Sequence, residues 1–226
     1  MSEALSSLVE LFAHPSVGAE GVEVARGELV FEQGAAAEHV YMIHRGQVRL
    51  YQVGPNGDER LVEILGAGQW CGCAALTSRG VYTTRAVAAT PGQLSKVSAA
   101  KLMQHVAAHP AAATQLIRQL AEHVQNAREE AARLQFDDCN QRLIQAMLRF
   151  SESAAASTQG TDVVLHLTHA QLAQAVGAAR ETVSLALTEM RLRNVVRTGR
   201  NRLIFNRDAL KQFATAQTAA VVANRN

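Results

Sequence analysis

The chain has 226 residues and a formal net charge of +2, which suits one large or two modest domains. It contains no run of about 18 apolar residues, and its N-terminal residues include acids rather than a basic stretch, so we expect a cytoplasmic protein with no membrane partner. Three cysteines are an odd and small number for a disulfide framework, and free thiols are expected.

The small net charge hides a difference between two parts of the chain. Residues 1–134 hold 11 Lys or Arg and 13 Asp or Glu, whereas residues 135–226 hold 11 and 7. Within residues 180–211 the numbers are 8 and 3. Such a local surplus of positive charge is typical of a surface that contacts nucleic-acid phosphates, although a solvated basic face would also produce it.

Residues 22–97 alternate apolar and polar side chains in short runs that glycines interrupt, which predicts antiparallel strands. The segment GPNGD joins VRLYQV to ERLVEIL, and its Pro and Asn-Gly favour a tight turn, so we expect a hairpin there. Short strands at this spacing predict a small barrel or β-roll. Amphipathic helical segments near residues 2–12 and 99–107 bracket it.

A long helix is expected to start at Pro110. Its apolar residues are spaced alternately four and three apart over more than three heptads: Ala113, Ile117, Leu120, Val124, Ala127, Ala131 and Leu134. Two positions in seven is the width of a coiled-coil seam, whereas a helix lying on its own domain usually has a wider apolar stripe. We therefore expect a parallel homodimer, with a helix packed on its own domain as the alternative.

The C-terminal part has the outline of a DNA reader. Asp137 or Asp138 can cap a helix over CNQRLIQAMLRFSESAAA, and residues 151–161 are expected to form a surface loop. Residues 168–205 then predict a helix, a tight turn at Gly177, a second helix and a basic hairpin. Beyond Leu210 the tail is expected to fray. The apolar positions of the two reader helices are Leu172, Ala173 and Val176, followed by Val183, Ala186, Leu187 and Met190.

The second of these helices carries Arg180, Glu181 and Ser184 on its outward side. The major groove of DNA admits a helix, and such side chains can form hydrogen bonds with base edges there. A dimer of such readers implies a palindromic operator with half-sites about one helical turn apart.

Several segments together resemble the Crp/Fnr family over roughly residues 5–212: GELVFEQG at 27–34, VYMIHRGQVRLY at 40–51, the long helix, and RETV at 180–183. The resemblance implies an α+β fold with an antiparallel β-roll of the cyclic-nucleotide-binding type over residues 1–109. A dimerisation helix over 110–135 and a winged helix-turn-helix domain over 136–226 would follow. It also implies a transcription regulator rather than an enzyme, with RNA polymerase as a partner.

The resemblance extends, residue by residue, to the predicted DNA-binding helices. It implies that Arg180 contacts guanine and that Glu181 contacts a cytosine amino group, while Ser184 stands where the oxygen-sensing branch has a base-reading Ser. Leu185 replaces an Arg of many members, so it either touches a thymine methyl or tucks back into the domain, and the operator sequence stays open. We assign the phosphate contacts to Thr168, His169, Arg200 and Arg202.

The expected sensor departs from the family. Where cyclic-AMP members have a Gly-Glu pair for the ribose and an Arg-Ser pair for the cyclic phosphate, this chain has Gly72-Cys73 and Tyr82-Thr83. Because a buried phosphate needs a cation and donors, we expect no cyclic-AMP binding of the usual kind. Ala127 and Arg128 stand where the resemblance implies the adenine-binding hydroxyl pair. The residues of the candidate effector pocket are Gly72, Cys73, Thr83, Thr84, Arg85, His123, Ala127 and Arg128.

Cys71 and Cys73 offer a different chemistry in the same place. On a strand, residues i and i+2 face the same side, and soft thiolates bind haem iron, zinc or copper(I) or undergo oxidation. The resemblance aligns Cys71 with a Cys ligand of the carbon-monoxide-sensing haem branch, and His123 or His44 would complete such a site. Two small core cysteines are the alternative. The cofactor therefore stays open among none, haem, and a cyclic nucleotide other than cyclic AMP, such as cyclic di-GMP.

These observations favour a dimeric transcription regulator whose β-roll responds to a small molecule, a haem-bound gas or a redox state. A regulator that needs no effector, with its pocket filled by side chains, is a second hypothesis. A metal-dependent β-barrel enzyme would need an H-x-H motif on the barrel strands, and residues 22–97 contain none.

Overall fold

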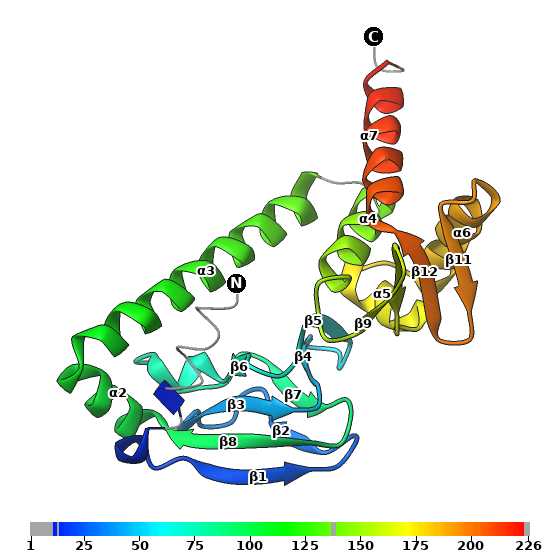
Figure 1. Cartoon of the computed structure of the whole chain (residues 1–226). Coiled ribbons are helices and arrows are strands. Elements are labelled where there is room, and N and C mark those ends of the chain that lie inside the picture. The colour runs from blue at the N-terminus through cyan, green and yellow to red at the C-terminus, as the bar shows by residue number, and fades with distance from the viewer. Residues whose placement is uncertain (1–10, 13, 137–138, 224–226) are drawn as a thin grey trace. The chain divides into compact units, whose positions relative to one another are not determined.

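The computed structural model describes residues 11–12, 14–136 and 139–223, and Figure 1 shows their elements. They form two compact units, which are divided between Glu130 and Ala131 within helix α3 (Pro110–Phe136). No helix among the described residues has both the length and the apolar character that crossing a bilayer requires.

Two antiparallel four-stranded sheets make up most of the N-terminal unit, with strand orders β1-β8-β3-β6 and β2-β7-β4-β5. The elements are η1 (Pro15–Val17), β1 (Glu20–Val24), β2 (Leu29–Phe31), β3 (His39–Arg45), β4 (Val48–Val53), β5 (Glu59–Leu65), β6 (Trp70–Cys71), η2 (Cys73–Leu76), β7 (Arg85–Ala88), β8 (Gly92–Ser98) and α2 (Ala99–Ala108). The predicted β-roll is confirmed, and β4 and β5 form the predicted hairpin.

Alternation along β3 divides the apolar residues of this unit between two clusters. Tyr41 and Ile43 belong to a core that combines residues from both sheets. Val40 and Met42 belong to a second cluster, with Trp70 and residues of α2 and α3. The period of two therefore gives this strand two buried sides, one toward the facing sheet and one toward the helices.

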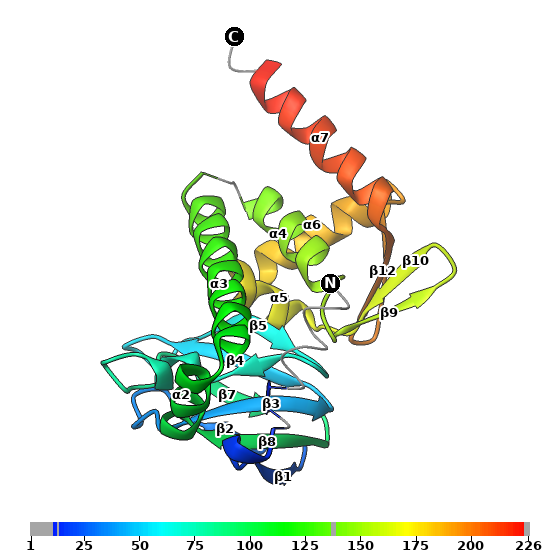
Figure 2. The same ribbon diagram turned by 60° about the vertical axis from the view of Figure 1, so that its left-hand side comes forward.

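The C-terminal unit combines helices with one antiparallel sheet of order β11-β12-β10-β9. Its elements are α4 (Cys139–Phe150), β9 (Ala156–Gln159), β10 (Asp162–Leu165), α5 (His169–Val176), α6 (Arg180–Leu192), β11 (Val196–Gly199), β12 (Arg202–Asn206) and α7 (Arg207–Ala223). Helices α5 and α6 with the β11–β12 hairpin form the predicted winged helix-turn-helix, and Figure 2 shows the β9–β10 hairpin of the same sheet.

Two expectations for this unit are wrong. Part of the expected loop 151–161 is strand β9, which pairs with β10 through a turn at Gly160 with φ 62°. The tail expected to fray instead continues as α7 to Ala223, in keeping with the high helix propensity of its alanine and glutamine residues. Residues 1–10, which hold most of the helix expected near 2–12, and the candidate caps Asp137 and Asp138 lie outside the described residues.

Candidate nucleic-acid interface

Helix α5 begins at a capping box. The Thr168 hydroxyl accepts a hydrogen bond from the Gln171 backbone N–H (3.1 Å), and the Gln171 side-chain oxygen accepts one from the Thr168 backbone N–H (3.0 Å). These reciprocal bonds satisfy donors that a helix start leaves free. The helix ends at Gly177, whose φ of 64° suits a residue without a Cβ. The predicted turn at Gly177 is therefore confirmed, and α6 begins soon after it at Arg180.

Helix α6 buries one side and exposes the other. Its predicted apolar residues Val183, Ala186, Leu187 and Met190 are all buried. Arg180 and Glu181 are exposed in the first turn. Leu185 is 73% exposed, so of the two roles considered for it, the one in which it tucks back into the domain does not apply.

Ser184 is half-buried and forms a hydrogen bond with a residue of α5. Its hydroxyl oxygen lies 3.0 Å from Nδ1 of His169, the first residue of α5. Burial lowers the pKa of His169, and the positive charge of Arg180 lowers it further, because both disfavour the protonated imidazole. His169 is consequently neutral near pH 7.

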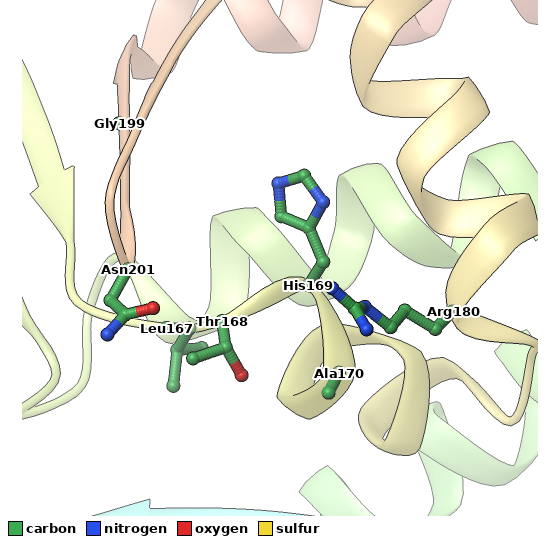
Figure 3. A pocket seen from close by; sticks show the side chains of 7 residues that line it. All are labelled: Leu167, Thr168, His169, Ala170, Arg180, Gly199 and Asn201. Atoms are coloured by element: carbon green, nitrogen blue, oxygen red, sulfur yellow. The ribbon is translucent and has the colours of Figure 1, made fainter.

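An open groove of about 410 Å³ separates the N-terminal ends of the two reader helices from the tip of the wing. Figure 3 shows His169 and Arg180 on the helical side of this groove, and Gly199 and Asn201 on the wing. Neither wing residue was predicted from the sequence. The signal that was available is the Gly-Arg-Asn order of the wing turn, where Asn201 adopts a φ of 56° that Asn tolerates better than most residues.

The wing carries three arginines in two different situations. Arg197 on β11 is paired with Asp162 of β10. Arg200 and Arg202 are exposed and have no acidic partner among the residues that the structure describes. Their charges are therefore free to meet an external anion, as the phosphate assignment requires.

At the predicted effector pocket, Gly72 separates the two cysteines. Strand β6 ends at Cys71, Gly72 has a φ of 85°, and Cys73 begins the short helix η2. Cys71 is buried and Cys73 is exposed. The expectation that both cysteines lie on one strand is therefore wrong, because Gly72 ends the strand, and the two side chains differ in exposure. Burial also raises the pKa of the Cys71 thiol, which leaves little thiolate to bind a metal.

The histidines considered as further ligands have other contacts. Nε2 of His44 lies 2.6 Å from the Ser95 hydroxyl, and the His123 ring lies against Trp70 with 5.7 Å between ring centroids. Within the described part of the chain, no three His, Cys, Asp or Glu side chains are grouped so that they would hold a metal ion. A haem or metal site at the cysteines stays a prediction.

The resemblance in sequence matches Tyr82 to an Arg of the cyclic-AMP members. Tyr82 is buried, its ring stacks on Phe31 with 4.1 Å between centroids, and its hydroxyl donates to the His39 carbonyl at 2.7 Å. Thr83 and Thr84 follow, one exposed and one half-buried. Nothing in the sequence pattern indicated that Tyr82 is a packed core residue.

Arg85 on β7 is the one cation among the predicted pocket residues of the β-roll. Its guanidinium lies 2.7 Å from a Glu59 carboxylate oxygen and 3.4 Å from one of Glu32. Two carboxylates thus compensate its charge, and it is a poor partner for a further anion.

Helix α3 packs on the β-roll through one face. Ala112 and Leu116 are buried in the second apolar cluster, and Leu120 packs against it in part. Ile117 and Val124 of the predicted seam are 65% and 51% exposed. The seam residues therefore form an apolar stripe beside the buried face.

Three further predicted residues lie toward the C-terminal end of α3. Ala127 belongs to both the seam and the pocket predictions, Arg128 belongs to the pocket prediction, and both are exposed. The side chain of Ala131 lies outside the described ones. The pocket predicted to combine the β-roll with Ala127 and Arg128 therefore stays a prediction.

Each of the two units matches a known protein family. The cyclic nucleotide-binding domain family matches residues 21–109, and the Crp-like helix-turn-helix domain family matches residues 141–213. The CRP-like cAMP-activated global transcriptional regulator of Mycobacterium tuberculosis is 30% identical over 195 residues, which cover 85% of this chain and 87% of that protein.

Solved structures agree with these matches. A transcriptional regulator of the CRP/FNR family from Thermus thermophilus has a TM-score of 0.74 and 26% identity, covering 87% of this chain and 98% of its own. The c-di-GMP responsive global regulator CLP of Xanthomonas campestris shares the fold, with a TM-score of 0.76, 18% identity and coverage of 89% and 99%. The predicted α+β architecture is thus confirmed, and the chain belongs to the Crp/Fnr family of transcription regulators.

Proposed function

We propose that this protein is a dimeric, sequence-specific DNA-binding transcription regulator in which α6 reads bases in the major groove. The observation that carries the proposal is the exposed side of α6, where Arg180, Glu181 and Leu185 lie beside half-buried Ser184. Arg suits guanine O6 and N7, Glu accepts from the cytosine amino group, and an exposed Leu can contact a thymine methyl.

Groups that suit phosphate contacts flank this reading surface. Thr168 and His169 stand at the N-terminus of α5, where backbone N–H groups and the helix dipole favour anions. Arg200 and Arg202 stand on the wing, across the groove from them. Contacts on both sides of the reading helix would fix its register on the duplex.

Dimerisation through α3 is supported by the exposed stripe of Ile117 and Val124, with Leu120 between them. Two large side chains more than half exposed on one helix are costly in water, and a second copy of the same helix would cover them at heptad spacing. A two-fold dimer then binds a palindromic operator with half-sites about 34 Å apart, and RNA polymerase is the partner at the promoter.

The effector of this regulator is, in our proposal, not cyclic AMP held by the contacts usual in the family. The resemblance matches Cys73 to the ribose-binding Glu, Tyr82 is packed into the core, and Arg85 is compensated by two carboxylates. The residues at these positions do not fit a cyclic phosphate, because a buried phosphate needs an available cation.

Selection of binding sites from a randomised duplex library tests the function. The full-length protein should select a palindrome, and Arg180→Ala should weaken binding to it by about 100-fold or more, because the dimer loses one bidentate base contact in each half-site. Arg191→Ala, at the other end of the same helix, is the matched control and should keep nearly wild-type affinity. Failure of the wild-type protein to select any sequence would remove the proposal.

A further inference from the structure

One hydrogen bond joins the two reader helices at His169 and Ser184. Building on the proposed DNA-binding function, we propose that His169 is a positioning residue whose Nδ1 accepts a hydrogen bond from the Ser184 hydroxyl. Ser184 then offers only lone pairs to the DNA and selects a base with an exocyclic amino group, adenine or cytosine, at one operator position.

The geometry restricts what the serine hydroxyl can do. Nδ1 of His169 lies 3.0 Å from the Ser184 oxygen, within hydrogen-bond distance. Ser184 is half-buried, and the Thr188 hydroxyl donates to its backbone carbonyl at 2.8 Å in the next turn of α6. The serine hydroxyl has one proton and two lone pairs, so whichever group it meets first determines what it can offer to a base.

The direction of the bond follows from what the other imidazole nitrogen meets. A neutral imidazole has one N–H and one lone pair, and Nε2 of His169 has no hydrogen-bond partner among the described residues. A phosphate oxygen only accepts, so a neutral His169 beside the DNA backbone carries its proton on Nε2. Its Nδ1 then accepts from the Ser184 O–H, and the lone pairs of Ser184 are left for the base. In the major groove the donors are the adenine and cytosine amino groups.

Protonation of His169 would release this restriction. Both nitrogens of an imidazolium donate, so Nδ1–H would bond to the Ser184 oxygen and free the hydroxyl proton for guanine or thymine. In the protein without DNA, burial and the charge of Arg180 on α6 oppose protonation of the ring, whereas a DNA phosphate at Nε2 favours it. The other residues around the groove, Thr168 and Ala170 of the α5 end and Gly199 and Asn201 of the wing, do not titrate near neutral pH.

The test compares base preference, and it uses the full-length protein at pH 8.5. Selection with wild type and Ser184→Ala identifies the operator position at which only the serine protein has a preference. Wild type should favour adenine or cytosine there by about three- to tenfold, the range expected of one hydrogen bond. His169→Arg offers donors only, and it should reduce that preference to less than about twofold while still contacting phosphate.

A pH profile separates positioning from a merely structural role. At pH 5.5 the wild-type preference should fall toward that of His169→Arg, whose own preference should not change with pH. His166→Ala is the matched control, because His166 is an exposed histidine of the same domain that contacts Ser157 rather than Ser184. It should behave as wild type at both pH values.

Different outcomes would overturn the role of His169 and the proposed DNA-binding function. A wild-type preference for guanine or thymine at pH 8.5, or an unchanged preference in His169→Arg, overturns the role of His169 while the selected operator stands. The role of His169 is also overturned if Ser184→Ala changes the base preference at no position of the selected operator. Selection of no sequence by wild type would instead overturn the proposed function and the inference together.

Discussion

Arg85 of β7 and Glu59 of β5 form an ion pair with 2.7 Å between the guanidinium and the carboxylate, and Glu32, which follows β2, lies 3.4 Å from the same guanidinium. The three side chains are partly exposed, so the pair adds little to stability. The ion pair instead affects the charge of the predicted pocket. Arg85 is the one cation among the predicted pocket residues of the β-roll, and it already has two acidic partners.

The first prediction concerns cyclic AMP. Titration of the purified protein with cyclic AMP should give no saturable heat at micromolar concentrations, and operator affinity should not change when the nucleotide is added. The physical reason is the lack of an available cation for the cyclic phosphate at Tyr82 and Arg85. The cAMP-activated regulator of Mycobacterium tuberculosis is the control that should bind. Micromolar binding to this protein would contradict the prediction.

Gly72 provides a prediction about stability. It has a φ of 85°, and a Cβ there would lie 2.8 Å from the His39 carbonyl oxygen. Gly27 has the same φ, but a Cβ would meet nothing within 4 Å. Gly27→Ala should therefore lower the free energy of unfolding by about 1 kcal/mol from backbone strain alone. Gly72→Ala should cost about 1–3 kcal/mol more, because the backbone must also shift.

Denaturant unfolding of the two variants measures that difference directly. Equal losses for Gly27→Ala and Gly72→Ala would show that the approach of Gly72 to His39 carries no cost. The comparison matters for function, since the same left-handed residue ends the strand between Cys71, which is buried, and Cys73, which is exposed.

The apolar stripe of α3 gives a prediction about assembly. Val124→Glu places a charge in the proposed seam, so it should convert the dimer to a 24.3 kDa monomer in sedimentation velocity. Operator affinity should fall by about 100-fold or more, because two linked reading heads bind far better than one. Arg118→Glu makes a larger change of charge at an exposed position of the same helix and should remain dimeric. A wild-type protein that sediments as a monomer would contradict the proposal.

Local signals account for the parts of the fold that the sequence predicted correctly. Alternation along β3 and the GPNGD turn predicted the β-roll and its hairpin, and Gly177 predicted the turn between α5 and α6. Each of these features depends on neighbours within a few positions, so a pattern in the sequence is enough to indicate it.

The features that the sequence did not predict depend on partners far along the chain or on one backbone angle. Strand β9 is polar and exposed, and only its pairing with β10 makes it a strand. Gly72 reads as one residue of a strand, yet its positive φ ends the alternation. His169 and Ser184 each looked like an independent DNA contact, because no local pattern shows that they meet across two helices.

The last prediction concerns pH and a group of histidines near the start of α3. His105 is buried, its ring stacks on His109 with 4.1 Å between centroids, and its Nδ1 lies 2.7 Å from the Ser16 hydroxyl. Burial lowers the pKa of His105, and the nearby His109 and His14 lower it further.

In the unfolded chain His105 takes up a proton as the pH falls through about 6.5, whereas in the folded chain it stays neutral to a lower pH. Its contribution to stability is therefore complete above pH 6.5 and is lost as the pH falls below that value, because the unfolded state then binds more protons. The free energy of unfolding of the wild type should decrease between pH 7.5 and pH 5.5. The decrease should be smaller in His105→Gln, whatever the absolute stability of that variant. His44→Gln, at an exposed histidine of β3, is the control and should keep the wild-type slope. If His105→Gln also keeps the wild-type slope, the pH dependence arises elsewhere and the burial of His105 does not govern it.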